Sequence, residues 1–303
     1  MKSMKKIVAV LLAVVLVCLS FAACSSKDAK TDDNNSSAPA EKTAKVKVID
    51  INLTDEEYAL GVNKSDADLL QKTNDYIKEI KENGKLDEIC NRFFGEGEPV
   101  AVTSAKEDSS KDQLVVATNA EFEPFEYKKG DSFYGIDMEI VKGLADKLGK
   151  ELVIKDMKFE AVVTSVQNGK ADLAAAGLTV DATRAKQVNF ADSYYSASQK
   201  LIVKGDDTKF DACKTKEDVE AILNTLDENV KIGGQNGTTG QTYVKGDLEK
   251  GDDGFGFKGL KAKAVGYDNG SLAVQDLING NVDYVIIDAA PATAIVNAIN
   301  AVA

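Results

Sequence analysis

Apolar runs of strand length alternate with helical patterns from residue 114 to residue 300, and this alternation limits the fold more than any other feature of the sequence. The run "LVVAT" (Leu114–Thr118) predicts a buried strand, and apolar residues at helical spacing follow it up to Gly149. Strands separated by helices predict parallel sheets that helices cover on both faces. The alternation restarts after the extended segment "FADSYYSASQKLIVKG", so the sequence predicts two α/β lobes with a hinge and a central cleft.

A helical segment with the features of a domain end, Leu53–Gly95, comes before these lobes. Ser65 with Asp68 imitates a capping box, and Gly84 supplies a left-handed helix stop. The polar stretch from Glu96 to Lys111 that follows predicts a linker. The apolar positions that define the two helices of this segment are Leu70, Thr73, Ile77 and Ile80, followed by Leu86, Ile89, Cys90 and Phe93.

The N-terminal residues predict an export signal. Lysines at positions 2, 5 and 6 precede the apolar run Ile7–Leu19, which is too short to span a bilayer comfortably. Small residues then precede Cys24, which resembles a bacterial lipoprotein signal and implies a signal peptide over residues 1–23 with lipid attached to Cys24. Plain secretion is the alternative. Ser25–Thr43 contains no large apolar side chain, so residues 24–43 predict a flexible tether.

Composition excludes several classes of function. The chain contains no histidine, which removes imidazole bases, Ser-His triads and the commonest zinc ligand. Its net charge of −12 argues against nucleic acid as a partner. Cys18 leaves with the signal, and we expect Cys90 and Cys213 to be unpaired structural thiols, with a disulfide between them as the alternative.

Four blocks of residues 114–303 resemble the family 3 extracellular solute-binding proteins, the amino-acid receptors of ABC importers, and most of all the glutamine-binding kind. These blocks are "ATNAEFEPFEY", "GLTVDATRAKQVNFADSYY", "QNGTTGQTY" and "NGNVDYVIIDAAPA". The resemblance implies a two-lobed α/β fold of the type II periplasmic-binding-protein kind. It also implies a monomeric, extracytoplasmic lipoprotein that binds an amino acid, docks on a membrane permease and needs no cofactor or metal.

The position of Leu53–Gly95 suggests a circular permutation, because this block resembles the C-terminal block of the family. The resemblance implies that residues 44–53 form the last strand of the second lobe and that residues 54–95 form the closing helices of the first. Residues 96–112 would join the original termini. The two lobes would then comprise residues 113–203 and residues 204–303.

The residues that follow the predicted strands are the candidate ligand site, because open α/β sheets bind ligands at the carboxyl ends of their strands. The planar fork of Arg184 can hold an α-carboxylate, with surface pairing to Asp181 or Asp192 as the alternative. Thr238 and Thr239 begin a helix whose N–H groups attract an anion, or they form a simple N-cap. Asp288 ends an apolar strand and can pair with a ligand ammonium, or it caps the next helix.

The resemblance adds the rest of the site. Phe122 and Phe159 would be aromatic walls around the ligand side chain, although aromatic residues after strands more often belong to the core. Gly177 would offer a carbonyl group to the ammonium, and Thr179 a hydroxyl group to the carboxylate. Tyr194 and Tyr195 would support the crossing between the lobes.

Two positions bear on the identity of the ligand. Asn119 stands where the family commonly has aspartate, and Gln235 stands where glutamine binders often have lysine. Together they suggest a neutral polar ligand side chain, while Glu121 nearby leaves a basic ligand as a second option.

The sequence therefore suggests a binding protein without catalytic residues, in which the ligand docks on one lobe and the other closes over it. Two alternatives remain at this point. One is a sensory binding module without a transport role. The other is a dehydratase on the same fold, which would require an additional acid or base in the cleft.

Overall fold

A computed structural model describes residues 44–95, 97–247 and 255–302, all of which fall in one compact unit, Lys42–Ala303. The expected signal peptide, the Cys24 expected to carry lipid and the whole expected tether lie outside these residues. None of the helices within the described ranges is long and apolar enough to cross a membrane.

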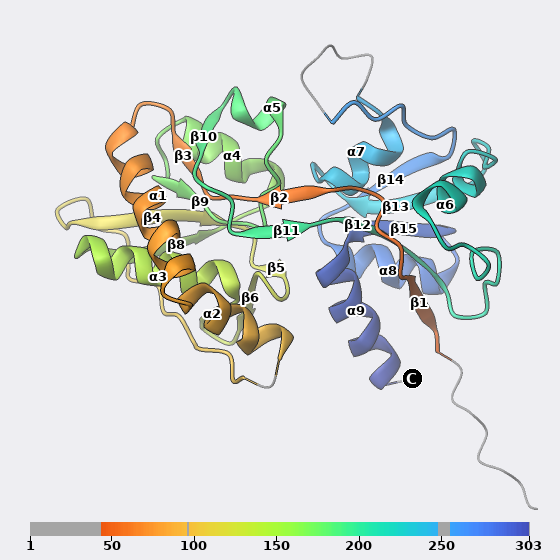
Figure 1. Cartoon of the computed structure of the whole chain (residues 1–303), viewed down its shortest axis with the longest axis horizontal. Coiled ribbons are helices and arrows are strands. Elements are labelled where there is room, and N and C mark those ends of the chain that lie inside the picture. Colours follow the sequence, from red (N-terminus) through yellow and green to blue (C-terminus); the bar gives the residue numbers. More distant parts are fainter. Residues whose placement is uncertain (1–43, 96, 248–254, 303) are drawn as a thin grey trace, which may run out of the picture. The chain divides into compact units, whose positions relative to one another are not determined.

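The first lobe, which we define as residues 59–194, is built on a five-stranded sheet in the order β10-β3-β9-β4-β8 (Figure 1). Strands β9 and β8 are parallel to β4, whereas β3 is antiparallel to both β9 and β10. The strands are β3 (Gly61–Asn63), β4 (Gln113–Thr118), β8 (Glu151–Asp156), β9 (Leu173–Ala174) and β10 (Val188–Phe190).

Helices cover both faces of this sheet, as the sequence predicts. Val116 of β4 packs into one apolar cluster with α1, α2 and α3, while its neighbour Ala117 packs into another cluster with α4, because successive strand residues face opposite sides. The helices of the lobe are α1 (Ala67–Glu82), α2 (Lys85–Phe94), α3 (Ile136–Leu148), α4 (Phe159–Gln167) and the short α5 (Ala182–Ala185).

The N-terminal cap of α1 differs from the prediction. Asp66, not Ser65, caps the helix, and its side chain accepts a hydrogen bond from the backbone N–H of Leu69 at 2.9 Å. Most of the expected apolar stripe is buried, namely Thr73, Ile77 and Ile80, but Leu69 is buried where Leu70 was expected, and Leu70 is only partly buried. Gly84 has the left-handed conformation that ends α1 and begins α2.

The second lobe, which we define as residues 44–53 and 199–302, is built on a sheet in the order β1-β12-β15-β13-β14 (Figure 1). Its strands are β1 (Val46–Ile49), β12 (Gln199–Lys204), β13 (Lys231–Gln235), β14 (Lys263–Tyr267) and β15 (Tyr284–Asp288). The described helices are α6 (Lys216–Leu223), α7 (Thr239–Lys245), α8 (Gly270–Asn279) and α9 (Ala289–Ala301). Val285 and Ile287 pack towards α8 and α9, and Ile286 packs towards α6 and α7.

The expectation of purely parallel sheets is wrong. In the second lobe β13 is parallel to β14 and β15, but β12 runs antiparallel to β15, and β1 runs antiparallel to β12. The chain enters β12 directly from the crossing between the lobes rather than through a helix, which reverses its direction relative to the helix-connected strands. For the same reason the second lobe begins at Gln199, before the expected boundary at residue 204.

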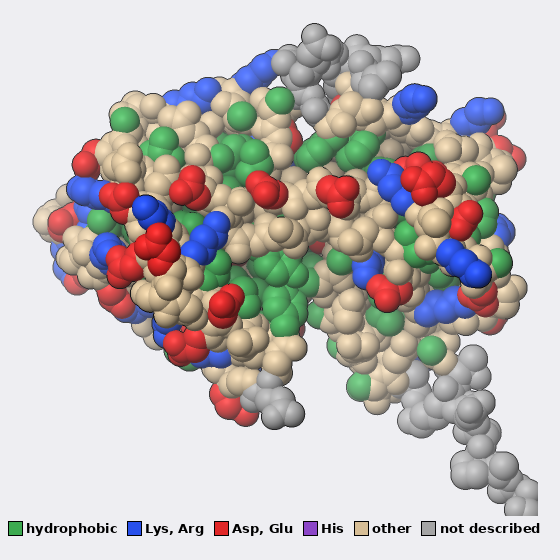
Figure 2. All heavy atoms as spheres, viewed as in Figure 1, with side chains coloured by type: hydrophobic (Ala, Val, Ile, Leu, Met, Phe, Trp, Pro, Cys, Tyr) green, Lys and Arg blue, Asp and Glu red, His purple; other side chains and the backbone are tan. Residues whose placement is uncertain are grey.

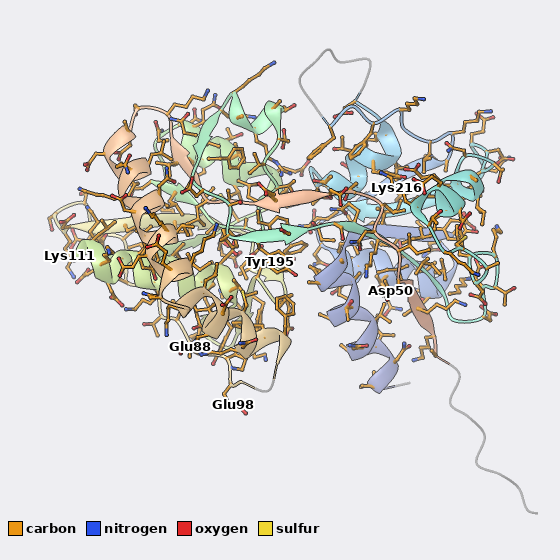
Figure 3. All side chains as sticks on the ribbon, in the orientation of Figure 1. Asp50, Glu88, Glu98, Lys111, Tyr195 and Lys216 are labelled. Atoms are coloured by element: carbon orange, nitrogen blue, oxygen red, sulfur yellow. The ribbon has the colours of Figure 1, made fainter. Side chains whose placement is uncertain are left out.

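A two-stranded antiparallel ribbon lies in the two segments that cross between the lobes. It consists of β2 (Glu56–Tyr58) and β11 (Tyr195–Ala197), and we call it the hinge ribbon. Figure 3 labels Tyr195 on this ribbon. A three-stranded meander, β5 (Glu121–Phe122), β6 (Glu126–Lys129) and β7 (Ser132–Tyr134), completes the first lobe.

Residues 97–112, the described part of the segment between α2 and β4, form no regular strand but are anchored to the first lobe. Val102 is buried and bridges to Phe133 of β7 through two backbone hydrogen bonds of 2.8 and 2.9 Å. The Ser104 hydroxyl accepts from the backbone N–H of Ile154 on β8. This segment therefore packs against the first lobe, whereas a polar linker was predicted.

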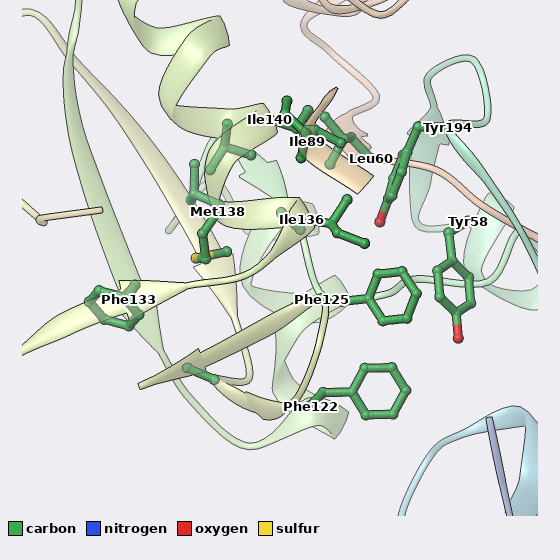
Figure 4. Close-up of a cluster of buried hydrophobic side chains, with 14 of the residues drawn as sticks. Tyr58, Leu60, Ile89, Phe122, Phe125, Phe133, Ile136, Met138, Ile140 and Tyr194 are labelled. Carbon is green, nitrogen blue, oxygen red and sulfur yellow. The ribbon is translucent and has the colours of Figure 1, made fainter. Parts of the chain in front are cut away.

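A cluster of aromatic rings packs where the first lobe meets the hinge ribbon. The ring centroid of Phe125 lies 4.9 Å from that of Tyr58 and 6.0 Å from that of Phe122 (Figure 4). Tyr194 donates a hydrogen bond to the buried carboxylate of Asp137, as expected for a supporting residue.

Cys90 and Cys213 are unpaired and partly buried. Acidic and basic side chains intermingle on the face shown in Figure 2.

Candidate functional site

A small cavity has walls from both lobes. Its free volume of about 10 Å³ is room for roughly one water molecule. Nine of the ten ligand-binding residues predicted from the sequence line it, and the tenth, Asn119, hydrogen-bonds to one of them. The lining residues are Phe122, Phe159, Gly177, Thr179, Arg184, Gln235, Thr238, Thr239 and Asp288.

Arg184 is a buried residue of α5, and neighbouring groups fix its guanidinium group. Nη1 donates to the carbonyl oxygen of Thr179 at 2.7 Å, and Nε lies 3.1 Å from the carboxylate of Asp181. The expected alternative pairing with Asp181 therefore exists, but it belongs to a buried site rather than to a surface ion pair. Burial lowers the pKa of Arg184 from its ordinary value, and the neighbouring carboxylates oppose this shift.

The guanidinium group also reaches the other lobe. Nη2 donates to the carbonyl oxygen of Gly237 at 3.1 Å, and the centre of the guanidinium group lies 5.3 Å from the ring centroid of Phe159. The cation is thus stacked on one predicted aromatic wall and directed towards the loop that precedes α7. A ligand carboxylate in this position would replace the Gly237 carbonyl as acceptor.

Asp288 ends β15 and is buried in the opposite wall. Although it occupies the N-cap position of α9, its side chain makes no capping hydrogen bond, so the alternative prediction of a side-chain cap is wrong. The Tyr58 hydroxyl donates to its carboxylate instead. Burial raises the pKa of Asp288 to about 7, and the negative charge of Glu56 adds to the shift, while hydrogen bonds from Tyr58 and Gln199 oppose it.

Thr238 and Thr239 lie where β13 ends and α7 begins. The Thr238 hydroxyl donates to the carbonyl oxygen of Gln235 at 2.8 Å, and it accepts no capping hydrogen bond from the N–H groups of α7. The Thr239 hydroxyl donates across the cleft to the hydroxyl of Thr179, at 3.3 Å. Helix α7 ends at Lys245.

Asn119 and Gln235 form a hydrogen-bonded chain between the lobes. Asn119 Nδ2 donates to the carbonyl oxygen of Met157 at 2.8 Å, which directs Asn119 Oδ1 towards Gln235. Gln235 Nε2 donates to that oxygen, also at 2.8 Å. This order leaves Gln235 Oε1 buried with no hydrogen-bond partner among the described residues. The Asn119–Gln235 pair therefore leaves one unused acceptor on a residue that lines the cavity.

Gly177 is a position where the backbone requires glycine. Its φ angle is +50°, and a Cβ atom there would lie 2.7 Å from Cε1 of Phe122. The residue thus allows the first aromatic wall to approach the backbone closely. Its N–H donates to Asp137 at 2.9 Å.

Sequence reasoning missed three buried residues beside the cavity: Glu56, Tyr58 and Gln199. The letters "DEEY" resemble a solvated acidic run, and only the pairing of β2 with β11 shows that Glu56 and Tyr58 point inwards while Glu57 is exposed. Glu121, by contrast, was expected near the ligand but does not line this cavity. It is exposed, accepts a hydrogen bond from Asn269 and lines a separate hollow.

The cavity's polar groups have the arrangement that a small dipolar molecule requires. The first lobe contributes the buried cation, the Thr179 hydroxyl group and two aromatic rings. The second lobe contributes the buried carboxylate, two threonine hydroxyl groups and the amide of Gln235. Within the described residues, no group of side chains has the composition of a metal site. The fold and the site together define a two-lobed α/β solute-binding protein.

Comparisons with known proteins agree with this class. The model of the bacterial extracellular solute-binding proteins, family 3, matches residues 114–247. The structure is similar to an ancestral arginine-binding protein bound to arginine, with a TM-score of 0.50 and 34% sequence identity, covering 62% of this chain and 75% of that one. The chain therefore belongs to the bacterial extracellular solute-binding proteins, family 3.

Two further comparisons bear on the ligand and on catalysis. The chain is 40% identical over 99 residues to the arginine-binding extracellular protein ArtP of Bacillus subtilis (strain 168), a match that spans 33% of this chain and 39% of that relative. It is also similar to the ancestral amino acid-binding protein AncCDT-1, a precursor of cyclohexadienyl dehydratase. The TM-score is 0.51 with 28% identity, covering 71% of this chain and 79% of that one.

Proposed function

We propose that this protein binds a free amino acid between its lobes as the receptor of an ABC importer. The observation that carries the proposal is that Arg184 and Asp288, from opposite lobes, line one cavity. A guanidinium group binds an α-carboxylate through two parallel hydrogen bonds, and a buried carboxylate binds an α-ammonium group. Neither charge would be left unpaired once the amino acid is bound.

Ligand entry requires the two walls to separate, because a cavity of about 10 Å³ is far smaller than an amino acid. The direct bonds from Arg184 to Gly237, from Gln235 to Asn119 and from Thr239 to Thr179 must then give way. We infer that the ligand first docks on the first lobe, and that the second lobe closes as the ligand replaces these bonds. Closure is favoured because the ligand contacts both lobes only in the closed form.

The side-chain end of the site supports a neutral polar ligand with a hydrogen-bond donor, such as a carboxamide. Gln235 Oε1 is a buried acceptor that has no partner within the described part of the chain, and Asn119 supplies no charge. A cationic side chain there would lose its hydration without gaining a carboxylate, which is costly. ArtP is an arginine-binding protein by name, and stacking between Phe122 and Phe159 is what an arginine side chain would gain here. Arginine is therefore the competitor to test.

We further propose an extracytoplasmic location with a lipid on Cys24 and a membrane permease as partner. The family membership supports the location, and the basic start, apolar run and small residues before Cys24 support the lipid.

We also propose that the chain is circularly permuted. The family match begins at residue 114, yet residues 44–95 supply an edge strand to the second lobe and a strand and two helices to the first. These elements complete both lobes from a position ahead of the match.

A thermal-shift screen of the mature protein against the twenty amino acids tests the binding proposal. A ligand at a hundred times its dissociation constant stabilises the folded state by about 2.7 kcal/mol. We expect one or a few polar amino acids to raise the melting temperature, with the effect lost in Arg184→Ala. A screen without any shift, in which Arg184→Ala behaves like the unaltered chain, would exclude amino-acid binding.

The similarity to AncCDT-1 makes a dehydratase the second candidate. Glu56 is the additional buried acid that such chemistry would need, but its carboxylate is held by Thr54, Thr179 and Gln199 and does not line the cavity. Binding without turnover is therefore favoured. Measured conversion of prephenate or arogenate would decide for the enzyme.

A further inference from the structure

Glu56 is a buried carboxylate in the hinge ribbon that contacts groups from each side of the crossing. Its Oε2 accepts a hydrogen bond from the hydroxyl of Thr179 at 2.8 Å, in the first lobe. Its Oε1 accepts from Nε2 of Gln199 at 3.1 Å, in the second lobe, and from the Thr54 hydroxyl. One side chain therefore joins both lobes at the point where the chain crosses between them.

Both lobe contacts lead directly to the ligand site. Thr179 lines the cavity, and its hydroxyl faces that of Thr239. Gln199 is the cross-strand neighbour of Asp288 in the β12–β15 pair. The negative charge of Glu56 is also close enough to raise the pKa of Asp288 beyond the effect of burial. Glu56 thus contacts Thr179, which is proposed to bind the ligand carboxylate, and influences Asp288, which is proposed to bind the ligand ammonium group. It does not itself line the cavity.

Other charged and titratable groups surround the two carboxylates. Tyr58 of the hinge ribbon donates to Asp288, and the Arg184 cation of α5 attracts both carboxylates. Glu126 of β6 is buried, neither of its carboxyl oxygens has a hydrogen-bond partner among the described residues, and burial holds its pKa well above the ordinary value. Glu56 and Asp288 repel each other, and Arg184 is the cation that attracts both of them.

We propose that Glu56 is a positioning residue of the amino-acid site, which holds Thr179 and sets the charge of Asp288 so that ligand capture depends on pH. This inference rests on the proposed amino-acid binding. An ammonium group binds the ionised form of Asp288, and the repulsion from Glu56 makes that form harder to reach as the pH falls. The ligand would be held near neutral pH and released in acid.

The experiment measures the dissociation constant of L-glutamine by calorimetry between pH 5.5 and 8.5, with the full mature chain. We expect the affinity of the unaltered protein to fall as the pH is lowered through about 7. In Glu56→Gln the midpoint of this fall should move to lower pH by about half a unit or more, because one like charge is removed. Glu57→Gln, on the exposed side of the same strand, is the matched control and should leave the midpoint unchanged.

Glu56→Asp separates charge from contact. It keeps the negative charge but shortens the reach to Thr179, so the affinity should fall at every pH while the midpoint stays in place. If Glu56→Gln also lowers the affinity without moving the midpoint, its role is only structural and the proposal is wrong.

A ligand-free measurement makes the proposal testable independently of binding. Carbon-13 NMR of labelled aspartate carboxyl groups follows the titration of Asp288 directly, with Asp288→Asn to assign the signal. A lower titration midpoint in Glu56→Gln supports the coupling, and an equal midpoint overturns it. If L-glutamine and the other amino acids bind to no variant at any pH, the proposed function fails, whereas the NMR titration still decides the role of Glu56.

Discussion

The side chain of Asn300, near the end of α9, is hydrogen-bonded to the backbone of Val46 at the start of β1. Asn300 Nδ2 donates to the carbonyl oxygen of Val46 at 2.8 Å, and Asn300 Oδ1 accepts from the N–H of Lys45 at 3.0 Å. Residues 254 positions apart in the sequence are therefore neighbours in space. A short connection between these two points would not disturb either element.

This proximity predicts that a rearranged chain, residues 97–302 followed directly by residues 44–95, folds to the same structure. The new junction joins α9 to β1, and the segment before β4 keeps its contacts with the first lobe although it no longer connects α2 to β4. We expect the same circular dichroism spectrum and the same ligand specificity. The control rearrangement omits residues 44–53, and it should be clearly less stable because β12 loses its edge partner β1. Failure of the complete rearrangement to fold would contradict the proposed permutation.

Arg184→Lys should weaken amino-acid binding about tenfold to a hundredfold, because a charge-assisted hydrogen bond contributes about 1.5–3 kcal/mol. Lysine retains the charge but cannot present two parallel donors to a carboxylate or stack on Phe159. Calorimetry at pH 8 measures the loss. Arg92→Lys is the matched control, since Arg92 pairs with Glu139 on the first lobe away from the cavity. Equal affinities for the Arg184→Lys variant and the unaltered protein would argue against carboxylate recognition by this residue.

Asn119→Asp should shift the preference from neutral to basic amino acids. The substitution removes the donor to the Met157 carbonyl and places a carboxylate beside Gln235. We expect the ratio of the dissociation constants for glutamine and arginine to change by about tenfold or more in favour of arginine. Asn83→Asp, which adds the same charge at the exposed end of α1, should not alter the ratio. If the unaltered protein already prefers arginine, the predicted neutral ligand is wrong.

Gly177→Ala should lower both stability and affinity. The positive φ angle costs about 1–3 kcal/mol for alanine, and the new methyl group would push against Phe122. Gly169→Ala separates the two effects, because Gly169 also has a positive φ angle but no atom lies within 4 Å of its Cβ position. Chemical denaturation and calorimetry should show that both variants are destabilised and that only Gly177→Ala binds the ligand more weakly.

Asp137→Asn should change the pH dependence of stability. Burial raises the pKa of Asp137 to about 7, so between about pH 4 and pH 7 the folded state holds a proton that the unfolded chain has released. The free energy of unfolding contributed by this group therefore falls as the pH rises through that range, by at most about 4 kcal/mol. The variant should gain stability relative to the unaltered protein as the pH rises from 4 to 7.

Urea denaturation at several pH values measures this difference in the free energy of unfolding. The exposed Asp131→Asn variant is the control and should show a constant difference across the range. A constant difference for Asp137→Asn as well would show that its carboxyl group does not titrate abnormally.

Local patterns predicted much of the fold. Strand β4 (Gln113–Thr118) contains the predicted run Leu114–Thr118, and α3 covers the predicted apolar stripe up to Gly149, because each element follows one clear hydrophobic period. Strand direction could not be predicted in this way. Whether β12 runs parallel or antiparallel to β15 depends on how the crossing segment enters the sheet, which no local period encodes.

The same distinction applies to the site: some of its residues can be predicted from their neighbours in the sequence, and others only from contacts with distant segments. Arg184 and Asp288 follow strands and carry charges that a cleft can use, so sequence position and chemistry were enough to identify them as candidates. Glu56 and Gln199 are buried by segments far away in the sequence, and their neighbours in the chain give no sign of it. Glu121 was placed wrongly beside the pocket because adjacency to Phe122 in sequence does not put both side chains on one face.

The order of the elements along the chain has a consequence for folding after export. Every strand of the first lobe's main sheet lies between residues 61 and 190, so in the exported chain that we propose this half can form its core before the last hundred residues have crossed the membrane. Strand β1, by contrast, emerges early and must wait for β12 before it has a partner. Until β12 arrives, β1 is an unpaired strand.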